Sequence, residues 1–515
     1  MPLETNHVDV LVVGAGVSGI GAGYHLQKNC PTKTYAILES RETIGGTWDL
    51  FRYPGIRSDS DMYTFGYSFK PWTNPTSIAD GPSILRYVRD TAKENGIEKH
   101  IRFQHKVKRA TWSSESAQWT VDIERGPNAE RVEFTCSFLF MCSGYYNYAA
   151  GYTPEFPGLD QFTGRVVHPQ QWTNDIEYTN KRVVVIGSGA TAVTLIPELA
   201  KTATHVTMLQ RSPTFMASRP SIDKFANTVR KFLPSKLAYG ITRWKNVLLG
   251  MFFFNMARKK PADVKKRMIE MVADELGPDY DVTTHFTPRY NPWDQRVCLV
   301  PDGDFFNSIK AGKAEVVTDH IASFTKHGIM LESGRELPAD LIVTATGLNL
   351  QTLGGLEIIV DGKRIDISTC LQYKGMMYSD IPNFASCFGY TNASWTLKAD
   401  LTSEYLCRVL NHMDKTGLRT CMPVNNDPSV TPEPYVDFTS GYFQRSLDQL
   451  PKQGSKRPWK LHQNYALDIK TLRMQKIDDG TLQFSNPLQF TNPEKFSDPK
   501  LPIPERVAQS LASKG

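Results

Sequence analysis

The stretch Val8–Leu26, VDVLVVGAGVSGIGAGYHL, decides the fold. It has the pattern of a buried strand, a tight turn and a helix in succession. Gly14, Gly16 and Gly19 form the pattern G-x-G-x-x-G, with Ser18 inside the turn. The first glycine permits the turn, the second lets the backbone approach a pyrophosphate, and the third lets the helix pack on the strand. The stretch therefore predicts a dinucleotide site at a helix N-terminus.

The next strand, TYAILE, ends at Glu39, twenty residues after Gly19. An acidic residue at this position accepts hydrogen bonds from a ribose 2′-hydroxyl and repels a 2′-phosphate. The first site is therefore predicted to bind FAD or NAD rather than NADP. The alternative is a glycine turn that binds no ligand.

The same arrangement occurs a second time in KRVVVIGSGATAVTLIPELA, residues 181–200. The strand that follows, HVTMLQRS, ends in Arg211 and Ser212 instead of an acid. Because an arginine at this position favours a 2′-phosphate, the second site is predicted to bind NADPH. Its predicted contacts are Gly187, Ser188, Gly189, Ala190, Thr191, Ala192, Arg211 and Ser212.

Two nucleotide units in one chain predict an α/β fold with two Rossmann-like dinucleotide-binding domains, one for FAD and one for NADPH. The strands SFLFMCSG, residues 137–144, and DLIVTATG, residues 340–347, are expected to take the chain from one domain to the other. We expect a first FAD-domain segment at 1–150, an NADPH domain at 151–344, and a second FAD-domain segment with the C-terminal region at 345–515. Residues 219–295 lack strand alternation and predict a helical insertion in the NADPH domain.

Composition excludes several classes of protein. The net charge of the 515 residues is +6, and the Lys and Arg residues are spread along the chain, which argues against a nucleic-acid partner. The eight cysteines show no CxxC and no metal-ligand spacing, so we expect reduced thiols and no metal site. The N-terminus enters a strand without the pattern of a signal peptide. These features predict a cytoplasmic protein.

The longest apolar run, VLLGMFFF, covers residues 247–254 and is far shorter than the ~20 residues needed to span a bilayer. Basic residues flank it: Arg243, Lys245, Arg258, Lys259 and Lys260. We expect a buried helix within the helical insertion. The alternative is peripheral contact with a membrane.

Two long motifs lie around the glycine turns. FTGRVVHPQQW, residues 162–172, fits FxGxxxHxxxW, although Thr173 follows it where Pro or Asp is usual, and GTWDLFRYPGIRSD, residues 46–59, fits [AG]GxWxxxx[FY]P[GM]xxxD. On these motifs the sequence resembles the type I Baeyer–Villiger monooxygenases, which are class B flavoprotein monooxygenases, over nearly the whole chain. The stretches CSGYYNY, YNPWDQR and GYTNASWTLKADL resemble especially the mycobacterial subgroup that activates ethionamide-type prodrugs.

The resemblance implies an FAD-containing enzyme that uses NADPH and O₂ and forms a C4a-peroxyflavin. Its substrates would be ketones, converted to esters or lactones, and also sulfides or thioamides. The alternative is a heteroatom monooxygenase that oxygenates sulfur or nitrogen with little carbonyl activity. A non-catalytic binding module would be expected to lack the second turn or Arg211, and both are present. A disulfide reductase would need a cysteine pair beside the flavin, which the first helix region lacks.

The resemblance assigns catalysis to Arg296, in NPWDQRVCL, with Asp59 as the partner that orients it. A fixed positive charge in a water-excluded pocket stabilises an anion, and arginine stays protonated there. The alternative is an ordinary ion pair. Most family members have Lys before this arginine, whereas Gln295 stands here. More of the contact to the NADPH 2′-phosphate is therefore expected from Arg211 and Ser212.

The FAD contacts that we expect extend from the first turn to later loops. They are Gly14, Gly16, Ser18, Gly19 and Glu39, and, by resemblance, Gly46, Thr47, Trp48, Asp49, Leu50, Asp59 and Val107. Arg57 and Ser58 are expected where flavin and nicotinamide converge. His168 is expected to be a hydrogen-bonded structural residue in a link between the domains, with direct chemistry as the alternative.

Overall fold

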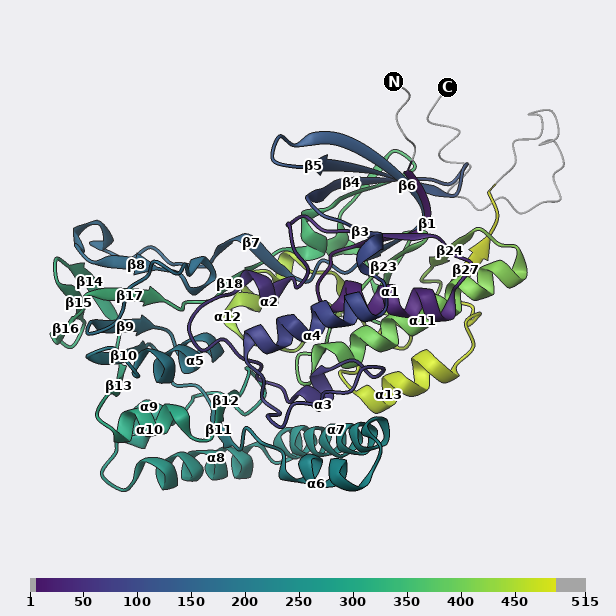
Figure 1. The fold of residues 1–515 in the computed structure, drawn as a ribbon. Helices are drawn as coiled ribbons and strands as arrows, with labels where there is room; N and C mark the ends of the chain where they lie inside the picture. Colours follow the sequence, from purple (N-terminus) through teal and green to yellow (C-terminus); the bar gives the residue numbers. More distant parts are fainter. Residues whose placement is uncertain (1–5, 488–515) are drawn as a thin grey trace, which may run out of the picture.

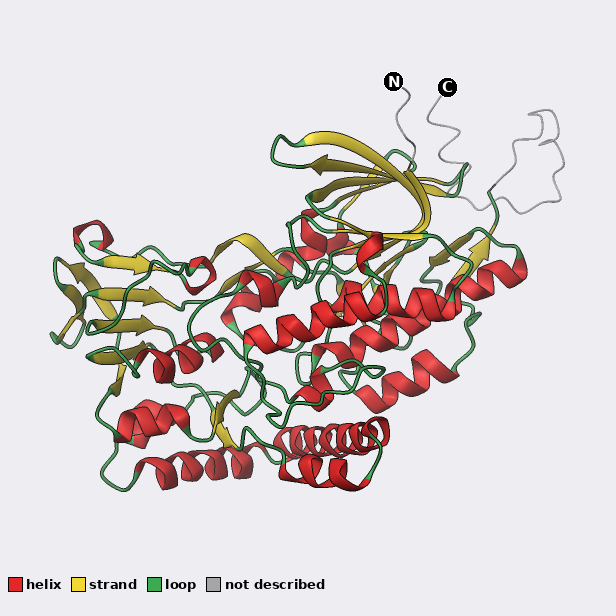
Figure 2. Ribbon diagram, viewed as in Figure 1, coloured by secondary structure: helices red, strands yellow, loops and turns green. Residues whose placement is uncertain are grey.

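The computed structural model describes residues 6–487, and it shows a mixed α/β fold built on two separate sheets (Figures 1 and 2). Both sheets contain parallel strands. In each sheet one strand leads through a glycine turn into a helix that packs beside the sheet. The predicted α/β class with two Rossmann-like units is therefore confirmed.

Within residues 6–487 the first sheet has nine strands in the order β20-β19-β4-β5-β6-β1-β2-β3, with β23 also paired to β6. The strands are β1 Asn6–Val13, β2 Tyr35–Leu38, β3 Ile101–Arg102, β4 His105–Ser113, β5 Gln118–Arg125, β6 Glu130–Met141, β19 Glu357–Val360, β20 Lys363–Ile365 and β23 Phe384–Ser386. Strand β1 lies parallel to β2 and β6, and its residues Val10, Leu11 and Val12 are fully buried. Such continuous apolar runs are typical of parallel strands covered on both faces.

Long helices from distant parts of the chain cover the first sheet. They are α1 Val17–Asn29, α4 Gly81–Glu94 and α11 Trp395–Thr416, which lie side by side in Figure 1. Helix α11 belongs to the C-terminal third of the chain, yet its Leu401 and Tyr405 join the same buried cluster as Val10 and Ile20. The C-terminal third thus completes the core of the first sheet.

The second sheet is parallel throughout, in the order β13-β10-β9-β17-β8. Its strands are β8 Arg165–Val167, β9 Arg182–Ile186, β10 His205–Gln210, β13 Ala314–Thr318 and β17 Leu341–Thr344. Helices α5 Ala190–Leu199 and α10 Asp304–Lys310 pack beside it, and an antiparallel sheet of β14 Ile321–Thr325, β15 Gly328–Leu331 and β16 Glu336–Pro338 adjoins it.

Two linking strands join the sheets. Strand β7, Tyr146–Gly151, pairs antiparallel with β18, Leu348–Leu350, between the two sheets (Figure 1). The predicted domain boundary after residue 150 falls inside β7, and the one after residue 344 falls at the end of β17. The boundaries at 150 and 344 stay predictions, and the end of the last segment at 515 lies outside the described residues.

Four helices occupy the region for which we expected a helical insertion. They are α6 Lys224–Phe232, α7 Ser235–Lys259, α8 Pro261–Leu276 and α9 Val282–Phe286, and they lie between the paired strands β11 Met216–Arg219 and β12 Cys298–Pro301. The remaining short elements are α2 Thr47–Leu50, α3 Met62–Phe65, α12 Gly441–Gln444, α13 Tyr465–Ile469, β21 Gln372–Tyr373, β22 Met377–Tyr378, β24 Thr420–Pro423, β25 Pro432–Pro434, β26 Lys452–Gly454 and β27 Leu482–Ser485.

The expectation that residues 247–254 form a buried helix is wrong. They belong to α7, but only Val247 is buried, whereas Leu248 and Phe252 are 57% and 59% exposed. The reason is that α7 packs on the rest of the protein along one face only. Tyr239, a residue of that inner face, is 3% exposed.

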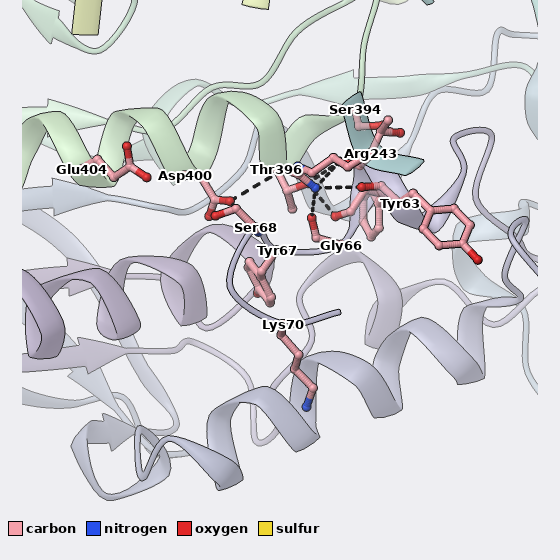
Figure 3. A network of polar contacts seen from close by, with 12 residues as sticks. Tyr63, Gly66, Tyr67, Ser68, Lys70, Arg243, Ser394, Thr396, Asp400 and Glu404 are labelled. Atoms are coloured by element: carbon pink, nitrogen blue, oxygen red, sulfur yellow. Dashed lines mark hydrogen bonds and ion pairs between the residues drawn. The ribbon is translucent and has the colours of Figure 1, made fainter. Parts of the chain in front are cut away.

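Arg243 anchors the inner face of α7 (Figure 3). Its guanidinium is buried and donates hydrogen bonds to the carbonyl oxygens of Tyr63, at 2.9 Å, and Gly66, at 2.7 Å. It also lies 3.8 Å from the Asp400 carboxylate on α11, which in turn bonds His25 on α1 at 3.2 Å. Because a buried charge is costly unless it is paired and hydrogen-bonded, this network favours a single position of α7 against the helices of the first sheet.

Gly19→Ala is expected to destabilise the protein by about 1–3 kcal/mol, because a built Cβ lies 1.8 Å from the carbonyl oxygen of Gly14 and α1 must move away from the turn. Gly250→Ala on α7 is the matched control. A Cβ there meets no atom within 4 Å. Replacing this helical glycine is therefore expected to raise the free energy of unfolding by about 0.5–1 kcal/mol. Urea unfolding of both variants measures the difference, and an unchanged stability of Gly19→Ala would show that the contact at this turn is loose.

Candidate active site

A cavity of about 660 Å³ lies at the first glycine turn. This volume is within the range of cofactor and ligand pockets. The cavity brings together eleven of the predicted residues: Gly14, Gly16, Ser18, Glu39, Gly46, Thr47, Trp48, Ser58, Asp59, Val107 and Arg296. They come from segments that are far apart in the chain. The tertiary fold therefore assembles this site, and no single motif contains it.

The first turn presents backbone to the cavity. Gly14 has φ of 108°, and a Cβ there would lie 2.6 Å from the carbonyl oxygen of Cys142. Gly16 is the N-cap of α1 and approaches the loop at Gly46. A Cβ built on Gly16 would lie 3.6 Å from the Cα of Gly46. Since Gly16 has no side chain to cap α1, the first amides of the helix are available to an anion.

Glu39 directly follows β2 and is 5% exposed. One carboxylate oxygen accepts a hydrogen bond from the backbone amide of Ala15 at 2.8 Å, and the other accepts from the amide of Arg41 at 2.9 Å. A carboxylate has about four acceptor positions, so Glu39 retains capacity for ribose hydroxyls. Together with the exposed helix amides, this donor and acceptor set fits a dinucleotide without a 2′-phosphate.

Four predicted residues lie outside the lining of this cavity: Gly19, Asp49, Leu50 and Arg57. Asp49 is 2% exposed, and its carboxylate pairs with Arg41 at 2.7 Å and with Arg89 on α4 at 3.0 Å. It therefore holds α2 against α4, and Gly19 packs α1 on the turn. Contact of these residues with a cofactor stays a prediction.

An ion pair lies in the wall of the cavity. The Nη1 of Arg296, in the loop between α9 and β12, donates to Oδ2 of Asp59 at 2.5 Å. Asp59 holds the pKa of Arg296 well above its ordinary value, although burial acts in the opposite direction. The guanidinium therefore keeps its positive charge beside the cavity.

Aromatic residues that the sequence did not predict as contacts form much of the wall: Tyr145, Tyr146, Tyr148, Tyr390 and Trp395. The indole of Trp395 donates to the Ser18 hydroxyl at 2.7 Å and stacks on the ring of Tyr145 at 5.3 Å. Burial raises the pKa of Tyr146, so its phenol is neutral. The stretches CSGYYNY and GYTNASW contained this signal, but aromatic residues in sequence more often indicate core packing.

The second glycine turn lies outside this cavity. Gly187 has φ of 128°, and Gly189 is the N-cap of α5, where a built Cβ meets no atom within 4 Å. The Ser188 hydroxyl donates to the carbonyl oxygen of Ser212 at 3.0 Å, which holds the turn beside the end of β10. Arg211 is exposed there, and within residues 6–487 no carboxylate forms an ion pair with it. The turn and its arginine are thus open to an anionic ligand.

The loop at residues 53–59 lies between the two turns. A Cβ at Gly55 would lie 3.0 Å from the carbonyl oxygen of Thr194 on α5, so the loop packs directly on the helix of the second turn. Arg57 forms an ion pair with Asp304 on α10. Ser58 and Asp59 face the cavity. This loop therefore contacts both nucleotide units at once.

His168 directly follows β8, packs beside the linking strands and is not in the cavity lining. Its Nε2 donates to the carbonyl oxygen of Gly347 at 2.9 Å, and its Nδ1 accepts from the amide of Gln170 at 3.1 Å. Burial lowers the pKa of the imidazole. A Cβ at Gly151 would lie 2.0 Å from the ring, so the histidine packs on the backbone of β7. This geometry supports the structural role.

Comparison with known proteins agrees with this geometry. The profile of the flavin-binding monooxygenase-like proteins matches residues 8–352. The chain belongs to this family. The enzyme class predicted from the motifs, a flavin monooxygenase, is thereby confirmed.

The chain is 56% identical to the FAD-containing monooxygenase EthA of Mycobacterium tuberculosis over 93% of its length and 98% of the relative. It is 47% identical to the probable FAD-binding monooxygenase AlmA of Acinetobacter baylyi, over 93% of this chain and 96% of the relative. Among solved structures, a steroid monooxygenase bound to NADP aligns with a TM-score of 0.69 at 23% identity, covering 81% of this chain and 88% of that one. A cyclohexanone monooxygenase in an open form aligns with a TM-score of 0.67 at 22% identity, covering 82% and 90%. These solved structures show the fold.

No helix within residues 6–487 is both long and apolar enough to cross a membrane. The same part of the chain contains no group of three or more His, Cys, Asp or Glu side chains that could hold a metal ion.

Proposed function

We propose that the protein is an FAD-containing, NADPH- and O₂-dependent monooxygenase of the Baeyer–Villiger type, which converts ketones to esters or lactones and also oxygenates sulfides or thioamides. The single observation that supports this best is the position of the Arg296–Asp59 ion pair. It lies in the wall of the same cavity that Glu39 and the first glycine turn line. A dinucleotide held by that turn therefore has a fixed positive charge beside it.

The cofactor assignment rests on the two ribose positions. Glu39 is a carboxylate that accepts hydrogen bonds and repels a phosphate, which suits FAD, whereas Arg211 suits the 2′-phosphate of NADPH. The relatives named FAD-containing monooxygenases and the steroid monooxygenase solved with NADP support the same pair of cofactors. When bound, FAD accepts a hydride from NADPH and activates O₂.

The residues of the cavity supply the surroundings for oxygen transfer. Arg296 stays charged because Asp59 is bonded to it, and it stabilises negative charge that develops on an oxygen in the cavity. Asp59 orients the guanidinium, and the rings of Tyr145 and Trp395 form part of the same cavity wall. In the overall reaction a ketone, O₂, NADPH and a proton give an ester, NADP⁺ and water.

A heteroatom monooxygenase is the second candidate, and the hydroxyls of Tyr145 and Tyr146 favour it. They lie 2.8 Å apart, and both line the cavity. Neutral phenols can donate a proton, and a protonated oxidant is electrophilic and attacks sulfur or nitrogen. Product analysis with a panel of aliphatic ketones and aryl sulfides decides between the two: esters support the first candidate, and sulfoxides without esters support the second.

Arg211→Ala is expected to raise the KM for NADPH about ten- to hundredfold and to leave the KM for NADH nearly unchanged. A charge-assisted hydrogen bond to the 2′-phosphate is worth about 1.5–3 kcal/mol, and NADH lacks this group. Arg131→Ala, at an exposed arginine on β6, is the control and is expected to keep the preference for NADPH. An NADPH/NADH ratio that Arg211→Ala does not change would remove the second turn as the NADPH site.

Arg296→Ala is expected to fold, bind FAD and be reduced by NADPH without oxygen, since hydride transfer needs only alignment of two rings. With oxygen it is expected to release hydrogen peroxide, and ester formation should fall by about 10²–10³, or 2.7–4 kcal/mol. Asp59→Ala should show a similar but broader defect. Arg258→Ala breaks ion pairs with Asp294 and Asp437 outside the cavity and serves as the control. Normal ester yield in Arg296→Ala would exclude a catalytic role.

A further inference from the structure

Most of the exposed large apolar side chains lie on the helical region. Of the twelve large hydrophobic side chains that are exposed within residues 6–487, ten lie between 222 and 253. They are Ile222, Phe225, Phe232, Leu237, Ile241, Trp244, Leu248, Leu249, Phe252 and Phe253. We call these ten residues the α6–α7 surface. Helices α6 and α7 lie next to each other at the edge of the molecule opposite β4 and β5 (Figure 1).

The spacing along α7 places most of these side chains on one face. Leu237, Ile241, Trp244, Leu248 and Phe252 follow one another at intervals of three or four residues, which is the repeat of an amphipathic helix. The opposite face is the anchored one, where Arg243 bonds backbone carbonyl oxygens in and just after α3 and lies beside Asp400 (Figure 3). The apolar face therefore points away from the protein, and the anchor prevents α7 from rotating to bury it.

The charge of this region is mainly positive, although Asp223, the N-cap of α6, pairs with Lys245 at 2.7 Å. Residues 224–260 contain nine Lys and Arg residues and no Asp or Glu. Lys231, Lys236, Lys259 and Lys260 are exposed, and no carboxylate within residues 6–487 forms an ion pair with them. An occupant of the α6–α7 surface must therefore combine apolar groups with negative charge.

We propose that the α6–α7 surface docks the protein peripherally on an anionic phospholipid bilayer. An amphipathic helix with large apolar side chains on one face and lysines beside it binds in the plane of the bilayer interface. Each Lys or Arg near an anionic leaflet strengthens the binding free energy by about 1 kcal/mol, which is about fivefold in affinity. A second copy packed face to face would bring the two sets of lysines together, and this like-charge repulsion opposes a dimer. The proposal goes beyond the oxygenation reaction and does not depend on it.

The test uses the purified full-length holoprotein and sedimentation with vesicles. Vesicles of phosphatidylcholine mixed with phosphatidylglycerol are expected to bind the protein, and vesicles of phosphatidylcholine alone are expected to bind it much more weakly. High salt should reduce binding to the anionic vesicles, because it screens the lysines. Protein that stays in the supernatant with both kinds of vesicle, or that binds both equally, would overturn the proposal.

Two sets of variants separate the apolar and the electrostatic contributions. The triple variant Leu248→Ser, Phe252→Ser, Phe253→Ser should lose vesicle binding, and Lys231→Gln, Lys236→Gln, Lys259→Gln should weaken it by about a hundredfold. The matched controls are Met474→Ser, at a methionine that is 74% exposed, and Lys326→Gln with Lys363→Gln, at exposed lysines of other segments. The controls should bind as the wild type does.

Melting temperature and bound flavin, measured for every variant, show that the fold is kept. Sedimentation equilibrium without vesicles distinguishes the other occupant. If the wild type is a dimer and the apolar triple variant is a monomer, and if neither binds anionic vesicles, the α6–α7 surface joins two copies of the chain and the membrane proposal is wrong. Equal vesicle binding by the wild type and both sets of variants would also overturn it.

Discussion

The ion pair between Arg296 and Asp59 depends on how the two nucleotide units are held together. Asp59 ends a loop that starts beside the first glycine turn, whereas Arg296 comes just before β12, which adjoins the second sheet. The bond therefore forms only when the units lie in one relative position. A shift of a few ångströms would leave Arg296 without its carboxylate and would remove the fixed charge from the cavity wall.

Three further contacts maintain this position, and each uses a different kind of interaction. Gly55 packs without a side chain against α5, Arg57 pairs with Asp304 on α10, and His168 bonds Gly347 between the linking strands. The first is steric, the second ionic and the third a buried hydrogen bond. Two of them come from the loop at residues 53–59 and the third from the linking strands, so together they restrict how one unit moves against the other.

The helical region is held by a different constraint. Arg243 lies among carbonyl oxygens and near Asp400, and the cost of leaving any of these groups unpaired fixes the inner face of α7. That same constraint determines which side chains face outward. The apolar residues of the α6–α7 surface are thus exposed as a consequence of where one buried charge finds its partners.

The sequence by itself determined the local parts of this protein. Both glycine turns, the acid at Glu39 and the arginine at Arg211 follow from short-range rules, since a strand, a turn and a helix N-terminus lie within a few residues of one another. Only the tertiary structure decided which groups meet across the chain. Asp49 pairs with Arg89 instead of facing the cavity, and Trp395, from the C-terminal third, reaches Ser18 in the first helix. It also left Leu248 and Phe252 exposed, although the pattern of residues 247–254 predicted a buried helix. The physical reason is that burial and pairing depend on which distant segment packs on each face, and an apolar run in the sequence is the same whether a neighbouring element covers it or not.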